Sequence, residues 1–156
     1  MLNHRSNLQF RAADLEDLSA VIRMLADDFL GEQREHLEDP LPECYTKAFT
    51  EIEEDPNNEL IVAELNGEVI GTLQLTFTPS LSHQGSKRCT VESVRVDGKF
   101  RGQGFGREMM RWAVERATEK GCASMQLTTH NDRSDAHRFY ESIGFSSTHT
   151  GMKLKL

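Results

Sequence analysis

The sequence predicts a mixed α/β (α+β) fold in a single domain that covers residues 1–156. A length of 156 residues suits one domain with one hydrophobic core. Segments with strand-like and helix-like periodicity follow one another in the order β-α-α-β-β-β-α-β-α-β-β. No repeat and no Gly-, Pro- or Ser-rich linker divides them. This order is typical of one sheet that is covered by helices.

The N-terminal part predicts one strand and two helices. A short strand is expected over residues 8–11. Asp14 then stands in N-cap position before a helical stripe of apolar residues that ends at Phe29. A charged loop is expected over 31–41, and Pro42 suits the first turn of the second helix. The two helices should therefore cover part of the sheet.

The middle of the sequence predicts a β-hairpin and a further strand. Strand-like runs over 60–63 and 69–77 flank the pair Asn66-Gly67. An Asn-Gly pair between two such runs is the strongest short-range signal for a hairpin. After a polar stretch, a further strand is expected over 90–96.

The last third predicts two helices and three strands. A helix should run from Gly104 to about Lys120 and end at Gly121. Ser134 should cap the last helix, which Gly144 ends. The expected strands are 125–129, 145–148 and 152–156.

The overall composition excludes several classes of protein. The net charge is −7, which disfavours a nucleic-acid-binding role. No apolar run exceeds four residues, so no segment is expected to span a membrane. Residues 1–5 lack the apolar stretch of a signal peptide, and the sequence therefore predicts a cytoplasmic protein.

The cysteine and histidine spacings predict neither a disulfide framework nor a metal site. Cys44, Cys89 and Cys122 are widely spaced and odd in number. The histidines show no metal-ligand spacing. We therefore expect reduced thiols and no metal cofactor.

Charge is distributed unevenly along the chain. Residues 1–86 contain 5 basic and 17 acidic side chains, whereas residues 87–156 contain 13 basic and 8 acidic ones. The second half could therefore attract an anion and the first half a cation, unless these charges only solvate helix surfaces.

A glycine-rich turn between a predicted strand and a predicted helix carries the strongest chemical signal. Gly102, Gly104 and Gly106 alternate at the start of the helix. Without Cβ atoms the backbone can curl around a phosphate, and the first amides of the helix have no partner within the helix. Positive side chains surround the turn, namely Lys99, Arg101 and Arg107. The turn is thus predicted to bind an anion, although a turn without a ligand would satisfy the same pattern.

Two well-known phosphate-binding motifs do not fit this turn. A P-loop needs Gly-Lys-Ser/Thr, but Gly106 is followed by Arg107 and Glu108. The dinucleotide fingerprint needs a third glycine where Arg107 stands. The turn is therefore of another kind.

Two separated motifs resemble the GNAT superfamily of N-acetyltransferases. The spacing Arg101-x-x-Gly104-x-Gly106 after a Val-Arg-Val strand resembles the loop that binds the acyl-CoA pyrophosphate in that family. Residues 136–145, Ala-His-Arg-Phe-Tyr-Glu-Ser-Ile-Gly-Phe, resemble its signature A-x-x-F/L-Y-E-x-x-G-F. The resemblance implies a mostly antiparallel, twisted sheet of six to seven strands that is splayed in the middle and flanked by about four helices. It also implies acetyl-CoA as co-substrate and a possible homodimer.

The resemblance further implies roles for individual residues. Tyr140 matches the tyrosine that protonates the departing CoA thiolate, and Glu92 matches a glutamate that deprotonates the amine directly or through water. The asparagine that many members place at position 133 is here Arg133, and Asn131 lies two residues earlier. The expected cofactor contacts are Val94, Arg95, Val96, Arg101, Gly102, Gln103, Gly104, Phe105, Gly106, Arg107, Asn131 and Arg133.

The implied chemistry agrees with elementary acid–base considerations. An alkylamine has a pKa of about 10.4 and is therefore almost wholly protonated at neutral pH. A base must remove a proton before attack on the thioester, and an acid must protonate the sulfur. Glu92 suits the first role, with His130 as the alternative base; Glu92 could also be simple surface charge, and Tyr140 a core residue.

The sequence therefore predicts an N-acetyltransferase for a primary amine, with a small molecule as the favoured acceptor. Acidic residues of the first half would attract a cationic acceptor, and the candidates are Asp27, Asp28, Glu32 and Glu35. Residues 133–145 are also similar to aminoalkylphosphonate N-acetyltransferases, in which case Arg95 or Arg133 could hold an anionic amine. A protein or peptide amine is a further alternative. A non-catalytic domain that binds acyl-CoA and acts as a regulator is the alternative of another class.

Overall fold

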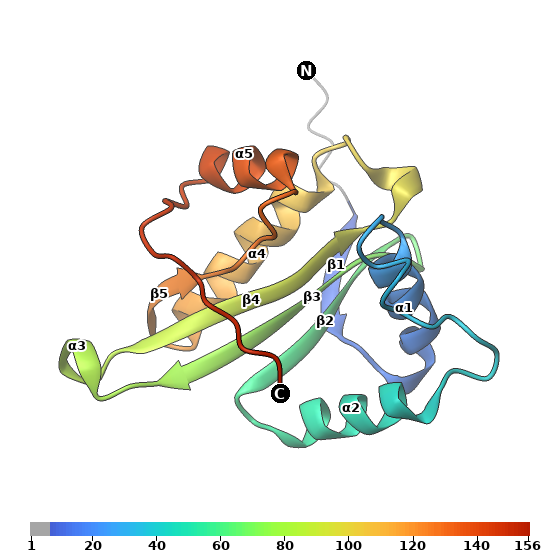
Figure 1. The fold of residues 1–156 in the computed structure, drawn as a ribbon, viewed down its shortest axis with the longest axis horizontal. Helices are drawn as coiled ribbons and strands as arrows, with labels where there is room; N and C mark the ends of the chain where they lie inside the picture. Colours follow the sequence, from blue (N-terminus) through green and yellow to red (C-terminus); the bar gives the residue numbers. More distant parts are fainter. Residues whose placement is uncertain (1–6) are drawn as a thin grey trace.

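Five strands form one sheet in the order β1-β2-β3-β4-β5, and helices cover both of its faces (Figure 1). The computed structural model describes residues 7–156. The strands are β1 (Leu8–Ala12), β2 (Asn58–Leu65), β3 (Glu68–Pro79), β4 (Lys87–Val96) and β5 (Cys122–Gln126). The helices are α1 (Leu18–Ala26), α2 (Glu43–Glu54), α3 (Ser82–Gly85), α4 (Phe105–Glu119) and α5 (Ser134–Ser142). Short 3-10 turns cover Leu15–Asp17 and Gly98–Phe100.

The predicted mixed α/β class is confirmed, but the sheet has five strands among the described residues instead of six to seven. β1 to β4 are antiparallel neighbours, and β5 is parallel to β4. Residues 145–148 and 152–156 form no strand. The alternating segment 152–156 leaves Met152 and Leu154 93% and 86% exposed, so its apolar face has no sheet to cover.

The boundaries of the first helix differ from the prediction for local reasons. Asp14 caps a 3-10 turn, and α1 ends at Ala26 instead of Phe29. The chain leaves the helix there because the Asp28 carboxylate accepts hydrogen bonds from the N–H groups of Leu30 and Gly31. Phe29 is consequently exposed.

Smaller differences affect α2, β5 and α5. Pro42 is the N-cap of α2 and not part of its first turn. β5 begins at Cys122 because Gly121, at φ 76°, turns the chain directly out of α4. Arg133, not Ser134, is the N-cap of α5, and no side chain caps that helix end.

The predicted hairpin is confirmed. Asn66 and Gly67 have φ values of 52° and 84°, which is the left-handed pair that a tight two-residue turn requires. The hairpin pairs β2 with β3. It thereby builds the centre of the sheet.

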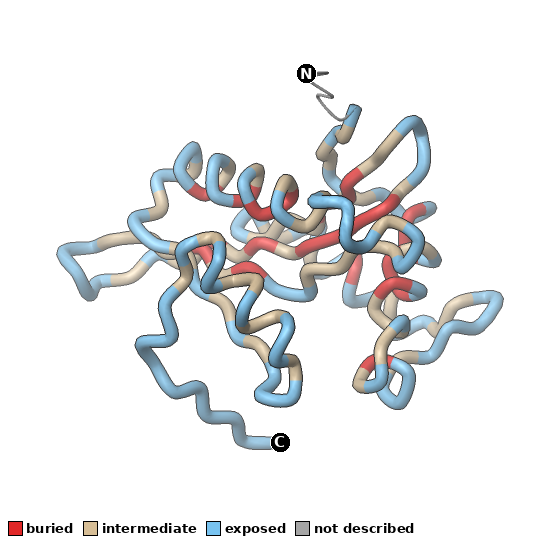
Figure 2. The backbone as a smooth tube through the Cα atoms, turned by 90° about the horizontal axis from the view of Figure 1, so that it is seen from above, coloured by how far each residue is buried: buried red, intermediate tan, exposed pale blue. Residues whose placement is uncertain are grey.

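The core lies between α4 and the face of the sheet that β3 and β4 present to it. Leu73, Leu75, Val91, Met109 and Met110 are at most 1% exposed and belong to this cluster. Figure 2 shows buried residues on the strands and on the helices that pack against them, whereas the C-terminal segment is exposed along its length. Residues of β4 and α4 are thus packed into one buried layer, which supports the part of the chain between them.

Among residues 7–156, no helix combines the length and the apolar character that crossing a membrane requires. The prediction that there is no signal peptide concerns residues 1–5, and these residues lie outside the described part of the chain.

Candidate active site

The glycine turn before α4 presents backbone donors to open space. Gly102 and Gly104 have φ values of 73° and 90°, and a Cβ added at either would meet no atom within 4 Å. Within residues 7–156, none of the backbone N–H groups from Gly102 to Gly106 donates a hydrogen bond to the protein. These donors lie at the positive end of the dipole of a 15-residue helix. The turn can therefore accept an anion at its backbone.

The arginines beside this turn are held by the protein itself. Arg101 donates through Nη2 to the Asp27 carboxylate at 3.0 Å and through Nε to the Val96 carbonyl at 3.1 Å. Arg107 donates to Ser142 Oγ at 2.9 Å, which connects α4 to α5. The predicted contacts from Arg101 to Arg107 thus come together in one turn.

Two further residues of the turn stabilise it from within. The amide of Gln103 donates to the Lys99 carbonyl at 3.1 Å. Phe105 packs edge-on against Phe100, with ring centroids 6.2 Å apart. These contacts hold the bend that exposes the backbone donors.

The ladder between β4 and β5 stops half-way along β4. Its last pair is Thr90–Gln126, and no later pair joins the two strands within the described residues. Ser93 has φ 54°, and the register of β4 against β3 shifts at this position, as in a β-bulge. The predicted contacts Val94, Arg95 and Val96 lie beyond this point, on a strand edge that β5 does not cover. An extended ligand could complete the sheet there.

Tyr140 lies on α5 among aromatic rings. Its ring is edge-on to those of Phe139 and Phe145, with centroids 5.2 and 5.8 Å away. Among residues 7–156, its hydroxyl forms no hydrogen bond. Burial raises the pKa of Tyr140 above its ordinary value of 10.0, although the positive charges of Arg95 and Arg133 oppose this. The hydroxyl is thus a protonated donor at neutral pH.

Glu92 lies on the face of β4 that points away from α4. It is exposed and stands opposite Gln74 of β3. The same face carries Asn58, which accepts hydrogen bonds from Gln74 at 3.1 Å and Thr76 at 2.8 Å. Glu92 therefore stands beside a polar row that can contact a hydrophilic acceptor.

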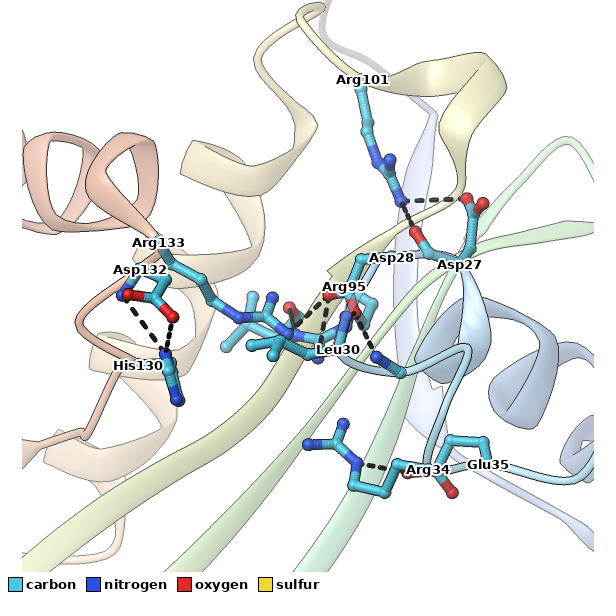
Figure 3. Close-up of polar contacts among 12 residues, drawn as sticks. Asp27, Asp28, Leu30, Arg34, Glu35, Arg95, Arg101, His130, Asp132 and Arg133 are labelled. Carbon is cyan, nitrogen blue, oxygen red and sulfur yellow. Dashed lines mark hydrogen bonds and ion pairs between the residues drawn. The ribbon is translucent and has the colours of Figure 1, made fainter.

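The loop before α5 contains three residues that were predicted as candidates for the site, and their side chains have different surroundings. Asn131 is exposed. His130 is 54% exposed at its side chain, and its Nδ1 accepts from the N–H of Asp132 at 3.2 Å. Arg133 points instead toward α1 and donates to Asp28 at 2.6 Å (Figure 3). Only Arg133 contacts another predicted site element.

Three of the four carboxylates expected to attract a cationic acceptor are already paired with arginines. Asp27 pairs with Arg101, Asp28 with Arg133, and Glu35 with Arg34 at 2.9 Å. Such neutralised carboxylates attract a free cation weakly.

The structure adds two features that the sequence did not reveal. One is the positive φ of Ser93, because no glycine or asparagine at this position indicates a left-handed backbone in the sequence. The other is the ion pair of Arg95 with Asp28 at 3.7 Å. Both depend on contacts between segments that are far apart in the chain.

The described residues fit a coenzyme A moiety. Glycines without neighbours, unpaired N–H donors and an uncovered strand edge provide room and donors for a diphosphate and for an amide-containing arm. No group of three or more potential metal ligands occurs within residues 7–156. A hollow of about 460 Å³ between β1, α2 and Trp112 contains none of the predicted site residues.

Comparison with known proteins extends these observations. The chain is 51% identical to a transcriptional regulator from Bacillus halodurans, whose crystal structure superposes with a TM-score of 0.92 over 96% of this chain and 100% of that one. A putative acetyltransferase from Agrobacterium tumefaciens is 28% identical, with a TM-score of 0.83 over 95% and 99% of the two chains.

An aminoalkylphosphonate N-acetyltransferase from Salmonella typhimurium is 35% identical over 95 residues, and the match spans 61% of each chain. The model of the acetyltransferase (GNAT) family matches residues 19–145, which contain the strand edge, the glycine turn and the Tyr140 helix. Membership of such a family indicates an acyltransferase, in agreement with the prediction from the two motifs. The chain belongs to the acetyltransferase (GNAT) family.

Proposed function

We propose that this protein transfers an acetyl group from acetyl-CoA to the primary amine of a small molecule. The observation that carries the proposal is the end of the β4–β5 ladder at Thr90, which leaves the edge of residues 91–96 uncovered on the part of β4 that leads to the free backbone donors of the turn at Gly102–Gly106. An uncovered strand edge next to an anion-binding helix start suits a ligand with an extended amide arm and a diphosphate.

The turn and the strand edge would hold acetyl-CoA. The N–H groups from Gly102 to Gly106 would bind its diphosphate, and the backbone of Val94–Val96 would pair with its arm. The co-substrate supplies the acetyl group as a thioester.

Glu92 would act as the general base. Its exposed carboxylate can take a proton from the ammonium group of the acceptor, directly or through a water molecule. The neutral amine then forms the C–N bond. His130 is the alternative base, and its exposure allows the same role.

Tyr140 would act as the general acid. As the C–S bond breaks, the sulfur takes the proton of the tyrosine hydroxyl, and the tyrosinate recovers a proton through solvent as the attached nitrogen loses its second proton and becomes the amide. The raised pKa of Tyr140 supports this role because the hydroxyl stays protonated at every physiological pH.

Kinetic measurements on four proteins test these roles. Release of the CoA thiol should be followed with acetyl-CoA and a panel of small amines, amino acids and a lysine peptide. Wild type should turn over at least one small amine, and Glu92→Gln and Tyr140→Phe should lose most of the activity. A loss in His130→Ala together with full activity of Glu92→Gln would assign the base to His130.

A second candidate function is acyl-CoA-dependent regulation without catalysis. It is favoured by the description of the 51%-identical Bacillus halodurans protein as a transcriptional regulator. The two functions differ in one outcome: a regulator would bind CoA but would acetylate none of the amines in the panel.

A further inference from the structure

Arginine side chains from two separate elements converge on one carboxylate next to Tyr140. Arg133, from the loop before α5, places Nη2 2.6 Å from Asp28 Oδ2. Arg95, from β4, places Nη2 3.7 Å from the same oxygen. Figure 3 shows both guanidinium groups directed toward Asp28. One carboxylate is thus shared by two cations.

The cluster has more positive than negative charge. Asp28 offers one negative charge to two guanidinium groups, and its other oxygen accepts from the N–H groups of Leu30 and Gly31. Burial, followed by the charge of Arg133, lowers the pKa of Arg95, and Arg34 adds to this effect. An arginine remains protonated even so, and the repulsion between these cations therefore favours a second anion.

One donor of the cluster has no acceptor. The Nε atom of Arg95 is buried and forms no hydrogen bond within the described residues, and the side chain of Arg95 is only 16% exposed. A buried donor without a partner is unfavourable, so an incoming acceptor atom gains affinity there.

The cluster lies at the predicted point of reaction. Arg95 occupies the same face of β4 as Glu92, on the other side of the bulge at Ser93. The charges of Arg95 and Arg133 both act on the hydroxyl of Tyr140. An anion held by the two arginines would therefore lie between the proposed acid and the polar face that carries the proposed base.

We propose that Arg95 and Arg133 form a subsite for a doubly charged phosphonate or phosphate group of the acceptor. This inference rests on the proposed amine acetyltransferase function. A phosphonate or phosphate group offers three oxygens and up to two negative charges to the two guanidinium groups, whereas a carboxylate offers two oxygens and one charge. The amine of the acceptor extends toward Glu92.

Acceptor selectivity tests the subsite directly. Rates should be compared for 2-aminoethylphosphonate, β-alanine and propylamine, which share a primary amine but differ in the acid group. Wild type should prefer the phosphonate over propylamine at least tenfold in kcat/KM and over β-alanine by less. Equal kcat/KM values for the phosphonate and propylamine would overturn the proposal.

Variants that remove one positive charge show which residues cause the preference for the phosphonate. The ratio of kcat/KM for the phosphonate over propylamine should fall at least tenfold in Arg95→Gln and in Arg133→Gln, because a general loss of activity cancels in this ratio. Arg138→Gln is the matched control, since Arg138 is exposed on α5 and pairs with Asp135. An unchanged ratio in a folded Arg133→Gln variant would contradict the proposal, as would a fall in the ratio that is equally large in the control.

Direct binding provides a readout that does not depend on turnover. Calorimetric titration with 2-aminoethylphosphonate should give a measurable dissociation constant in wild type. Asp28→Asn should bind it more tightly, because the amide oxygen can still accept from Gly31 while one competing charge is lost. Binding that is insensitive to Arg133→Gln would refute the subsite even if no amine is acetylated. Absence of product with every amine would instead refute the proposed enzymatic function.

Discussion

Arg101 and Asp27 join the glycine turn to the end of α1. The Arg101 Nη2 atom lies 3.0 Å from the Asp27 carboxylate and 3.2 Å from the Asp27 carbonyl oxygen, and Nε lies 3.1 Å from the carbonyl of Val96. The turn is therefore connected to β4 and α1 at once. The neighbouring residue, Asp28, pairs with Arg133, so one dipeptide contacts both the candidate cofactor turn and the candidate acceptor cluster.

Replacing Asp27 should strengthen the binding of coenzyme A. In Asp27→Asn the amide oxygen can still accept a hydrogen bond from Arg101, but a negative charge is removed from beside the diphosphate site. Because this pair is about half-exposed, the effect should be small, and the dissociation constant should fall about 2–5-fold. Calorimetry with CoA measures it, and Glu32→Gln is the control for charge removal in the same segment. Weaker binding would mean that the Asp27 charge is needed to position the turn.

Replacing Gly104 should abolish most CoA binding. Alanine at φ 90° costs about 1–2 kcal/mol, and it distorts the bend that exposes the backbone donors. We expect the dissociation constant of CoA to rise about tenfold or more, which corresponds to about 1.4 kcal/mol. Gly67→Ala is the matched control, because Gly67 has φ 84° and equally open space but lies in the β2–β3 hairpin. Equal CoA binding by the two variants would exclude the turn as the diphosphate site.

Tyr140→Phe should lower kcat and leave CoA binding intact. Loss of a general acid typically reduces the rate about 10²–10⁴-fold. Since burial raises the pKa of Tyr140 above 10.0, ionisation of this residue should cause no fall in the wild-type kcat between pH 7 and pH 9. Steady-state rates across this pH range provide the measurement. Tyr45→Phe is the control, because the Tyr45 hydroxyl donates to Glu35 in another part of the molecule. A Tyr140→Phe enzyme as fast as wild type would remove Tyr140 from the mechanism.

An ion-paired glutamate outside the site should control stability at acidic pH. Glu59 accepts from Arg116 at 2.6 and 2.9 Å and pairs with Lys120 at 3.0 Å, and the Arg116 hydrogen bonds lower its pKa below the ordinary 4.5. The folded pKa is depressed, so this stabilisation is present above pH 4.5 and is lost as the pH falls through the folded value. Glu59→Gln should reduce the free energy of unfolding at pH 7 by about 1–2 kcal/mol, because the partners are about one-third exposed.

Urea denaturation at pH 7 and at progressively lower pH measures this difference. It should shrink below pH 4.5, where wild type also loses the charge. Glu119→Gln is the control, since Glu119 is 67% exposed and pairs with the same Arg116. A difference that does not depend on pH would show that the ion pairs of Glu59 are not its cause.

Features with a local cause were predictable from the sequence. The Asn66-Gly67 turn and the bend at Gly104 require left-handed backbone conformations that glycine and asparagine adopt readily, and both were predicted. The face of α4 that contains Met109 and Ala113 follows from helical periodicity alone. Two motifs were enough to predict the family.

Features that depend on distant partners were not predictable. Residues 152–156 alternate as a strand does, but alternation does not supply a neighbouring strand, and none covers them among residues 7–156. The end of the first helix is a local exception: it was expected at Phe29, but the side chain of Asp28 accepts hydrogen bonds from the N–H groups of Leu30 and Gly31 and caps a turn there. The pairing of Asp28 with Arg133 changes the role that was expected for this carboxylate, because it already has a cation as its partner.

Mass spectrometry of the acceptor after incubation with acetyl-CoA tests the central claim most directly. The reaction should contain the wild-type protein and either 2-aminoethylphosphonate, propylamine or a lysine peptide, with Tyr140→Phe in parallel. We predict an N-acetylated small amine that forms in equal amount with free CoA thiol and is strongly reduced in the variant. Unmodified amines in every wild-type reaction, from a protein that binds CoA, would contradict the claim that this chain is an amine acetyltransferase.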